Sequence, residues 1–73
     1  MAQEIVEAPL PRKVLTVNVT VGNTVEEGGV ICTIEAMKME NPILSPVNGS
    51  VKELAISPGQ TVKTGEKLVV IEY

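Results

Sequence analysis

Apolar and polar residues alternate along short stretches of the chain, and turn-forming residues separate these stretches. In residues 13–20, Val17 and Val19 alternate with polar neighbours, which is the period of a half-buried strand. Further extended segments are predicted around residue 25 and at residues 30–35, 39–44, 51–56 and 67–73. Because the turns come at short and regular spacing, the pattern predicts an all-β sandwich or barrel without helices.

The two halves of the chain repeat each other. Pro9 aligns with Pro46, an offset of 46 − 9 = 37 residues, and the alignment then runs forward without a gap. The matched positions are Val14/Val51, Val17/Leu54, Val19/Ile56, Gly22/Gly59, Thr24/Thr61, Val25/Val62, Gly28/Gly65, Ile31/Leu68, Ile34/Ile71 and Glu35/Glu72. Neither half of such a repeat buries its apolar face alone, so both are expected to share one core. We predict a tail at residues 1–5 and one domain at residues 6–73.

The composition agrees with a small β domain. The 73 residues are near the lower size at which a chain folds without disulfides or metals. Its apolar content is mostly Val, Ile and Leu, with Tyr73 as the sole aromatic residue, and this favours strands. The sequence has no apolar run of transmembrane length and no basic region followed by an apolar stretch at its start. We therefore expect a cytoplasmic protein without membrane insertion.

Several classes of chemistry are excluded by the residues that are missing. The sequence has no His, no Asp and a single cysteine, Cys32, so the residue types of a catalytic triad or a typical zinc site are absent. Cys32 lies in an apolar stretch and is expected to be a buried, unreactive thiol. The glutamates are spread along the chain, which argues against a two-carboxylate hydrolytic site. The net charge of −3 argues against a nucleic-acid partner.

The predicted turn at the centre of the chain lacks the turn-forming residues found in the other predicted turns. A hairpin is predicted there with the turn Ala36-Met37-Lys38-Met39, whereas the other predicted turns contain glycine. Poor turn chemistry in an otherwise consistent sequence points to a functional site. A catalytic amine would need burial or a neighbouring cation, which a hairpin tip does not provide. An exposed lysine on a stiff hairpin suits the covalent attachment of a cofactor, because its side chain is accessible and can form an amide.

Residues 35–41, Glu-Ala-Met-Lys-Met-Glu-Asn, resemble the biotin attachment motif of biotinyl domains, the carriers of biotin-dependent carboxylases, decarboxylases and transcarboxylases. The resemblance extends over about residues 6–72 and includes the approach at residues 8–11 and the glycine rhythm of each half. It implies a flattened barrel or sandwich of two four-stranded antiparallel sheets related by a pseudo-twofold axis. It also implies biotin on the amine of Lys38. The rest of the implied attachment motif consists of Glu35, Ala36, Met37 and Met39, with the two methionines read by the ligase and the partner enzymes.

The resemblance also implies a division of labour. A biotin protein ligase joins biotin to Lys38. A biotin carboxylase using ATP and bicarbonate, or a decarboxylase donor, then loads carbon dioxide on the biotin, and a carboxyltransferase unloads it. The domain itself is then a carrier and not an enzyme, because the chemistry belongs to the cofactor and to the partner enzymes.

Two positions, Arg12 and Gly29, depart from the pattern of the family, and Gly29 stands where a polar residue is usual. Arg12 stands where the family commonly has glycine and where the second half has Gly49, so the first turn is expected to be made differently or opened locally. In the second half, Asn48-Gly49 is expected to bend the chain with a positive φ. The halves align without an insertion, which leaves no room for the protruding loop of some bacterial acetyl-CoA carboxylase carriers.

Two other functions stay open at this point. A lipoyl carrier shares the architecture and modifies a lysine in the same hairpin, but its motif usually has Asp before the lysine and Ala after it. This chain has Met37 and Met39 at those places. The second alternative is an unmodified β interaction module whose centre resembles the motif by chance.

Overall fold

The computed structural model describes residues 2–36 and 39–73, so Met1, Met37 and Lys38 lie outside the described residues. The described chain forms strands without a helix. The strands are β1 (Gln3–Glu7), β2 (Arg12–Val17), β3 (Thr24–Val25), β4 (Val30–Ala36), β5 (Met39–Leu44), β6 (Gly49–Leu54), β7 (Thr61–Val62) and β8 (Lys67–Glu72).

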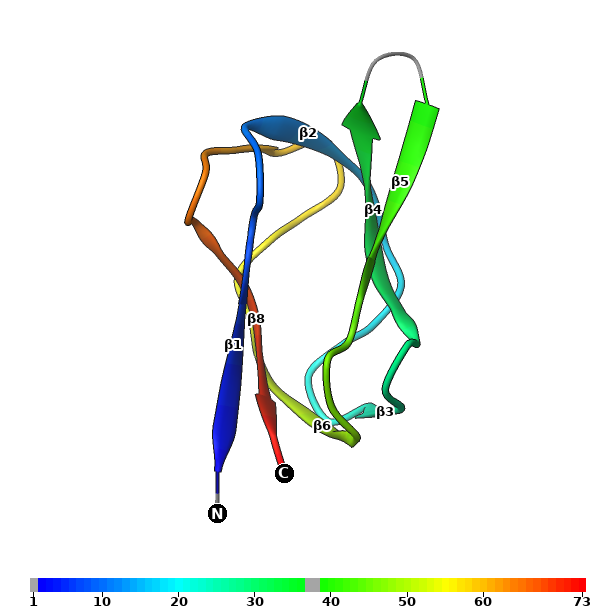
Figure 1. Cartoon of the computed structure of the whole chain (residues 1–73), viewed down its shortest axis with the longest axis vertical. Coiled ribbons are helices and arrows are strands. Elements are labelled where there is room, and N and C mark those ends of the chain that lie inside the picture. The colour runs from blue at the N-terminus through cyan, green and yellow to red at the C-terminus, as the bar shows by residue number, and fades with distance from the viewer. Residues whose placement is uncertain (1, 37–38) are drawn as a thin grey trace.

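The strands form two four-stranded antiparallel sheets with the orders β1-β8-β6-β3 and β5-β4-β2-β7 (Figure 1). The offset of 37 residues relates β2 to β6, β3 to β7 and β4 to β8, and β1 occupies the place that corresponds to β5. Exchanging each strand for its counterpart turns one sheet order into the other. The structure therefore confirms the predicted all-β class and the two sheets, and the sequence repeat appears as a pseudo-twofold relation.

Both halves supply the same places in a single core. The equivalent pairs Val14/Val51 and Ile31/Leu68 are each at most 2% exposed, and they belong to one buried cluster. Fully burying such a side chain stabilises the fold by about 1.5–3 kcal/mol. The remaining buried members of the cluster are Val6, Ala8, Val19, Val25, Cys32, Ile34, Ile56, Val62, Val69 and Ile71. One shared core agrees with the prediction that neither half is stable alone.

The start of the chain is part of the first sheet. Residues 3–5, which the sequence places in a tail, are the first residues of β1 and pair with residues 70–72 of β8. Ala2 and Tyr73 also exchange two backbone hydrogen bonds, each 2.9 Å long. The domain boundary after residue 5 stays a prediction, but the backbone from Ala2 onward is held by the sheet.

The turns before β3 and β7 repeat each other in detail. Gly22 and Gly59 both adopt positive φ, at 96° and 87°. The backbone N–H of Asn23 donates to the backbone oxygen of Thr20 at 3.0 Å. Likewise, the backbone N–H of Gln60 donates to the backbone oxygen of Ser57 at 3.2 Å. The side-chain oxygens of Asn23 and Gln60 in turn accept hydrogen bonds from the Thr20 and Ser57 amides, at 2.9 and 3.0 Å. The pseudo-symmetry therefore includes hydrogen bonds of the loops as well as the strands.

Substituting alanine for either of these glycines is expected to destabilise the fold by a similar amount. A Cβ at Gly22 or Gly59 would meet no atom within 4 Å, so the cost comes from the left-handed conformation alone, about 1–2 kcal/mol for an L-residue. Urea unfolding of Gly22→Ala and Gly59→Ala measures this cost. Asparagine at the same places should lose less, because Asn visits this conformation more readily. Unchanged stability in both alanine variants would contradict the assignment.

Gly49 corrects one expectation from the sequence. It is not among the glycines with positive φ and is instead the first residue of β6. A Cβ at this position would overlap the backbone oxygen of Glu72 and lie 2.8 Å from Cγ2 of Ile71. The expectation of a positive φ at Gly49 was therefore wrong: glycine is required here because β8 passes too close for any side chain.

The molecule is elongated, with extents of 36 × 18 × 17 Å. The β4–β5 hairpin lies at one end of the long axis, and the two chain ends lie side by side at the other (Figure 1). The fold therefore places strands β4 and β5 at one end of a narrow body.

Candidate cofactor-attachment site

The β4–β5 hairpin has a register that fixes the length of its loop. Ile34 pairs with Asn41, Glu35 with Glu40, and Ala36 with Met39. The loop therefore consists of the two residues at positions 37 and 38, which are Met37 and Lys38 and lie outside the described residues. The structure places Glu35, Ala36 and Met39 on the two strands next to these positions, while the roles of all five motif residues, Met37 and Lys38 included, stay predictions.

The hairpin leaves the core just before the loop. Ile34 is only 3% exposed and belongs to the buried cluster. Beyond it Glu35 and Glu40 are exposed, and Met39 is 69% exposed. An apolar side chain that is so exposed gains little from the fold. Single exposed apolar side chains are common on protein surfaces, so the role predicted for Met39 rests on its place beside positions 37 and 38.

The third strand of the sheet stops short of the hairpin tip. Towards the hairpin tip, the last pair between β2 and β4 is Val14 with Ile34. The equivalent ladder of the other sheet, between β6 and β8, continues by one more pair, Ser50 with Glu72. The equivalent pair, Lys13 with Glu35, is absent from the ladder. The difference coincides with Arg12, because its counterpart Gly49 allows a close approach that no other residue permits. The opening predicted from the sequence is thus one residue pair long.

Other chemistry is not apparent in the described part of the chain. Cys32 is fully buried, and burial raises the pKa of its thiol. Residues 2–36 and 39–73 contain no group of three or more potential metal ligands. They also form no cavity and no helix that could span a membrane. Among the features that the sequence singled out, the hairpin is the one placed in an exposed and prominent position.

The buried Cys32 predicts a specific pH dependence. Since its folded-state pKa is raised, the thiol favours the folded state below the unfolded pKa, about 8.5, and this contribution is lost as the pH rises further. We expect the free energy of unfolding to fall above that pH more steeply in the natural protein than in Cys32→Val. Urea unfolding at several pH values measures the difference. Parallel curves for the two proteins would contradict the prediction.

Comparison with known proteins now bears on the hairpin. The sequence matches the family model described as "Biotin-requiring enzyme" over residues 1–71. The chain belongs to this family. It is 43% identical over 70 residues to the biotin carboxyl carrier protein of Streptococcus mutans, covering 96% of this chain and 54% of that protein. It is also 41% identical over 68 residues to the mitochondrial propionyl-CoA carboxylase alpha chain of Homo sapiens, and this match covers 93% of this chain and 9% of that protein.

Solved structures show the same fold inside larger enzymes. The urea carboxylase of Kluyveromyces lactis matches with a TM-score of 0.89 and 26% identity, over 99% of this chain and 6% of that one. A single-chain, multi-domain long-chain acyl-CoA carboxylase matches with a TM-score of 0.87 and 29% identity, over 93% of this chain and 7% of that one. The chain thus spans about half of the Streptococcus mutans protein and less than a tenth of these carboxylases.

Sequence reasoning found the hairpin but not all of its surroundings. Arg12 was noticed as a departure from a glycine position, yet not as a neighbour of the attachment loop. The signal was present in the repeat. Aligning Arg12 with Gly49 places it at the end of a strand beside the hairpin. The pairing of β2 with β4 was needed to see that this place is beside the base of the hairpin.

Proposed function

We propose that this domain carries biotin as an amide on Lys38. The observation that supports the proposal most strongly is the β4–β5 register, which leaves positions 37 and 38 as the loop of a protruding hairpin. The residues around that loop, Glu35 and Met39, are exposed, as a ligase and later partners would require. The membership of the chain in the biotin family supplies the identity of the attached group.

In the proposed cycle the domain holds the biotin and moves it between active sites, and other proteins catalyse the reactions. A biotin protein ligase attaches the biotin. A biotin carboxylase or a decarboxylating subunit then places a carboxyl group on it, and a carboxyltransferase removes the group. The names of the similar proteins, a biotin carboxyl carrier protein and the carboxylase chains, support these partners. A cofactor on a tethered arm meets its active sites at a high effective concentration, so the domain acts as a carrier and not as an enzyme.

The fold suits this role. The β4–β5 hairpin lies at one end of a body 36 Å long and 17–18 Å across, and both sheets of that body share one buried core. A narrow end of this kind can enter an active-site opening that a wider domain could not. We propose that residues 6–73 form this functional unit. The cytoplasmic location predicted from the sequence stays a prediction.

The intact mass of the purified protein tests the proposal. After incubation with a biotin protein ligase, ATP and biotin, we expect a gain of one biotinyl group, and peptide mapping should place it on Lys38. A gain of one lipoyl group after incubation with a lipoyl ligase, without a biotinyl gain in the first reaction, would replace biotin by the alternative cofactor. No gain in either reaction would favour the unmodified interaction module.

A further inference from the structure

Arg12 lies beyond the end of the β2–β4 ladder, on the side of the hairpin. The last pair of that ladder is Val14 with Ile34, and Arg12 precedes Val14 by two residues on β2. Side chains two apart on a strand point to the same side, so Arg12 is on the core side of β2 with the buried Val14. The half-buried state of Arg12 agrees with this position. The Arg12 side chain therefore lies at the hairpin end of the sandwich.

The guanidinium of Arg12 has fewer acceptors than it has donors. Nη1 donates to the backbone oxygen of Pro11 at 2.8 Å. Nε is buried and has no hydrogen-bond partner among the described residues. Glu35, on the neighbouring strand, forms no described ion pair with Arg12. A guanidinium carries five N–H donors in a planar fork, and a carboxylate is the acceptor that matches this fork best.

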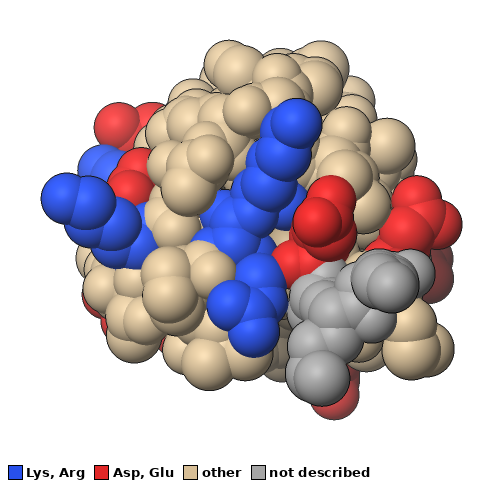
Figure 2. All heavy atoms as spheres, turned by 90° about the horizontal axis from the view of Figure 1, so that it is seen from above, with Lys and Arg blue, Asp and Glu red and all other residues tan. Residues whose placement is uncertain are grey.

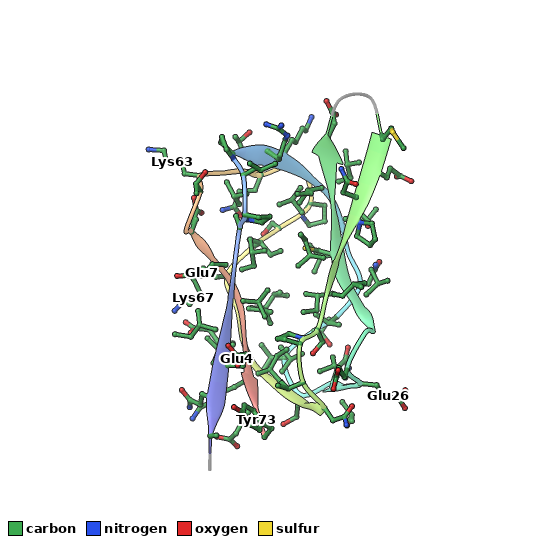
Figure 3. All side chains as sticks on the ribbon, in the orientation of Figure 1. Glu4, Glu7, Glu26, Lys63, Lys67 and Tyr73 are labelled. Atoms are coloured by element: carbon green, nitrogen blue, oxygen red, sulfur yellow. The ribbon has the colours of Figure 1, made fainter. Side chains whose placement is uncertain are left out.

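The cations that stand outside the described ion pairs gather at this end. The two described ion pairs join Lys52 to Glu72 at 3.3 Å and Lys67 to Glu53 at 2.8 Å. Arg12, Lys13 and Lys63 take part in neither, and the pairing of Arg12 with Val62 places Lys63 beside β2. Figure 2 shows Lys and Arg atoms across the middle of this end face, and Figure 3 shows Lys63 near the same end and Tyr73 at the other.

We propose that Arg12 is a resting site for the carried carboxyl group: between deliveries its guanidinium pairs with the carboxylate of carboxybiotin folded back on the end face. The inference rests on the proposed function. Attachment removes the lysine charge and carboxylation adds one negative charge, so the formal charge of −3 becomes −3 − 1 − 1 = −5. A domain of that charge repels the group that it carries unless a local cation offsets the repulsion, and Arg12 is placed to do so.

The carried carboxylate fits Arg12 better than an acidic group of a partner does. Arg12 lies at the hairpin end of the molecule, so a group attached to the hairpin returns to the neighbourhood of Arg12 each time it leaves a partner. An attached group therefore has a high effective concentration at the guanidinium, whereas a partner must first be recruited. Arginine is also suited to the task because its planar fork loses less freedom for each hydrogen bond formed.

Pairing with Arg12 should slow the spontaneous loss of carbon dioxide. In that loss the bond between the ureido nitrogen and the carboxyl carbon breaks, its electron pair stays on the nitrogen, carbon dioxide leaves, and the nitrogen takes a proton from water. A guanidinium that stabilises the carboxylate opposes the flow of electrons out of it. Exposed ion pairs are weak, so the expected effect on the rate is about two- to fivefold.

The test measures the decay of the isolated, loaded carrier. Biotinylated protein is carboxylated with a biotin carboxylase, ATP and labelled bicarbonate, separated from the enzyme, and followed by the label that remains bound. We expect Arg12→Gln to lose label about two to five times faster than the natural protein. Arg12→Lys should lie between them, and high salt should remove the difference. Lys63→Gln makes the same change of charge at the same end and should decay as the natural protein does.

A second measurement does not depend on the decay. The ¹⁵N NMR signal of the Arg12 Nε–H group should shift on carboxylation of the biotin but not on biotinylation alone. Equal decay of Arg12→Gln and the natural protein, or an Nε–H signal that carboxylation leaves unchanged, would overturn the inference. Slower delivery to a carboxyltransferase with unchanged decay would also overturn it, because Arg12 would then bind a partner. A natural protein that accepts no biotin or no label would instead contradict the proposed function.

Discussion

Replacing Lys38 by arginine is expected to abolish biotin incorporation completely while leaving the fold intact. Arginine keeps the positive charge, but its guanidinium stays protonated at any accessible pH and offers no free amine for an amide bond. No described residue from Glu35 to Pro42 belongs to the buried cluster, so we expect a change at position 38 to leave the core intact. The free energy of unfolding should therefore stay within about 0.5 kcal/mol of the natural value.

Intact mass and a streptavidin blot after treatment with the ligase measure this result. Lys52→Arg and Lys63→Arg are the matched controls. They make the same chemical change on β6 and directly after β7, and both should be biotinylated as the natural protein is. Biotin found on another lysine of Lys38→Arg would show that the ligase does not read the hairpin, and it would remove the basis of the proposed function.

Position is the physical reason why only one lysine should react. Lys52 and Lys67 each pair with a glutamate on the face of the β6–β8 sheet, where an approaching enzyme meets a broad surface. Strands β4 and β5 of the hairpin instead stand at the narrow end of the molecule (Figure 1). From Glu35 onward, β4 no longer pairs with β2, so the outer part of the hairpin consists of β4 and β5 alone. We therefore expect a ligase to reach this end of the hairpin without displacing any part of the described core.

Most of the fold was predictable because the repeat carries it. The offset of 37 residues gave equivalent places to Val14 and Val51, and both are buried in the shared core. The same offset placed Gly22 and Gly59 in equivalent turns, and both have positive φ. Hydrophobic period and glycine spacing are local signals, and they agree here with the tertiary structure, as they do in sequences that specify one fold.

The failures came where tertiary contacts decide the outcome. Gly49 was expected to turn the chain, whereas its role is set by the backbone of Glu72, which lies far away in the sequence. Likewise, the pairing of residues 3–5 with β8 depends on strand partners, which no local pattern names. The position of Arg12 beside the hairpin required the register of β2 on β4 for the same reason. Sequence signals identified the attachment motif but not its neighbours in space.

Gly49→Ala is expected to have the largest effect on stability among the changes considered, a loss of about 3 kcal/mol, the upper end of the range for overpacking. The added Cβ would overlap the backbone oxygen of Glu72, and the backbone of β8 cannot move aside without breaking the pair of Ser50 with Glu72. Of a total stability of about 5–15 kcal/mol for a typical domain, this is a large share.

Arg12→Ala provides the matched control, because it places the same side chain at the pseudo-symmetric position. The chain there is already open by one residue pair and accommodates a longer side chain, so this variant should lose less than about 1 kcal/mol. Urea unfolding of both variants measures the contrast. Equal losses would mean that the two halves are equally tight at this place, and that the opening beside the attachment hairpin is absent in solution. A loss confined to Gly49→Ala would instead tie the opening to the half that carries the cofactor.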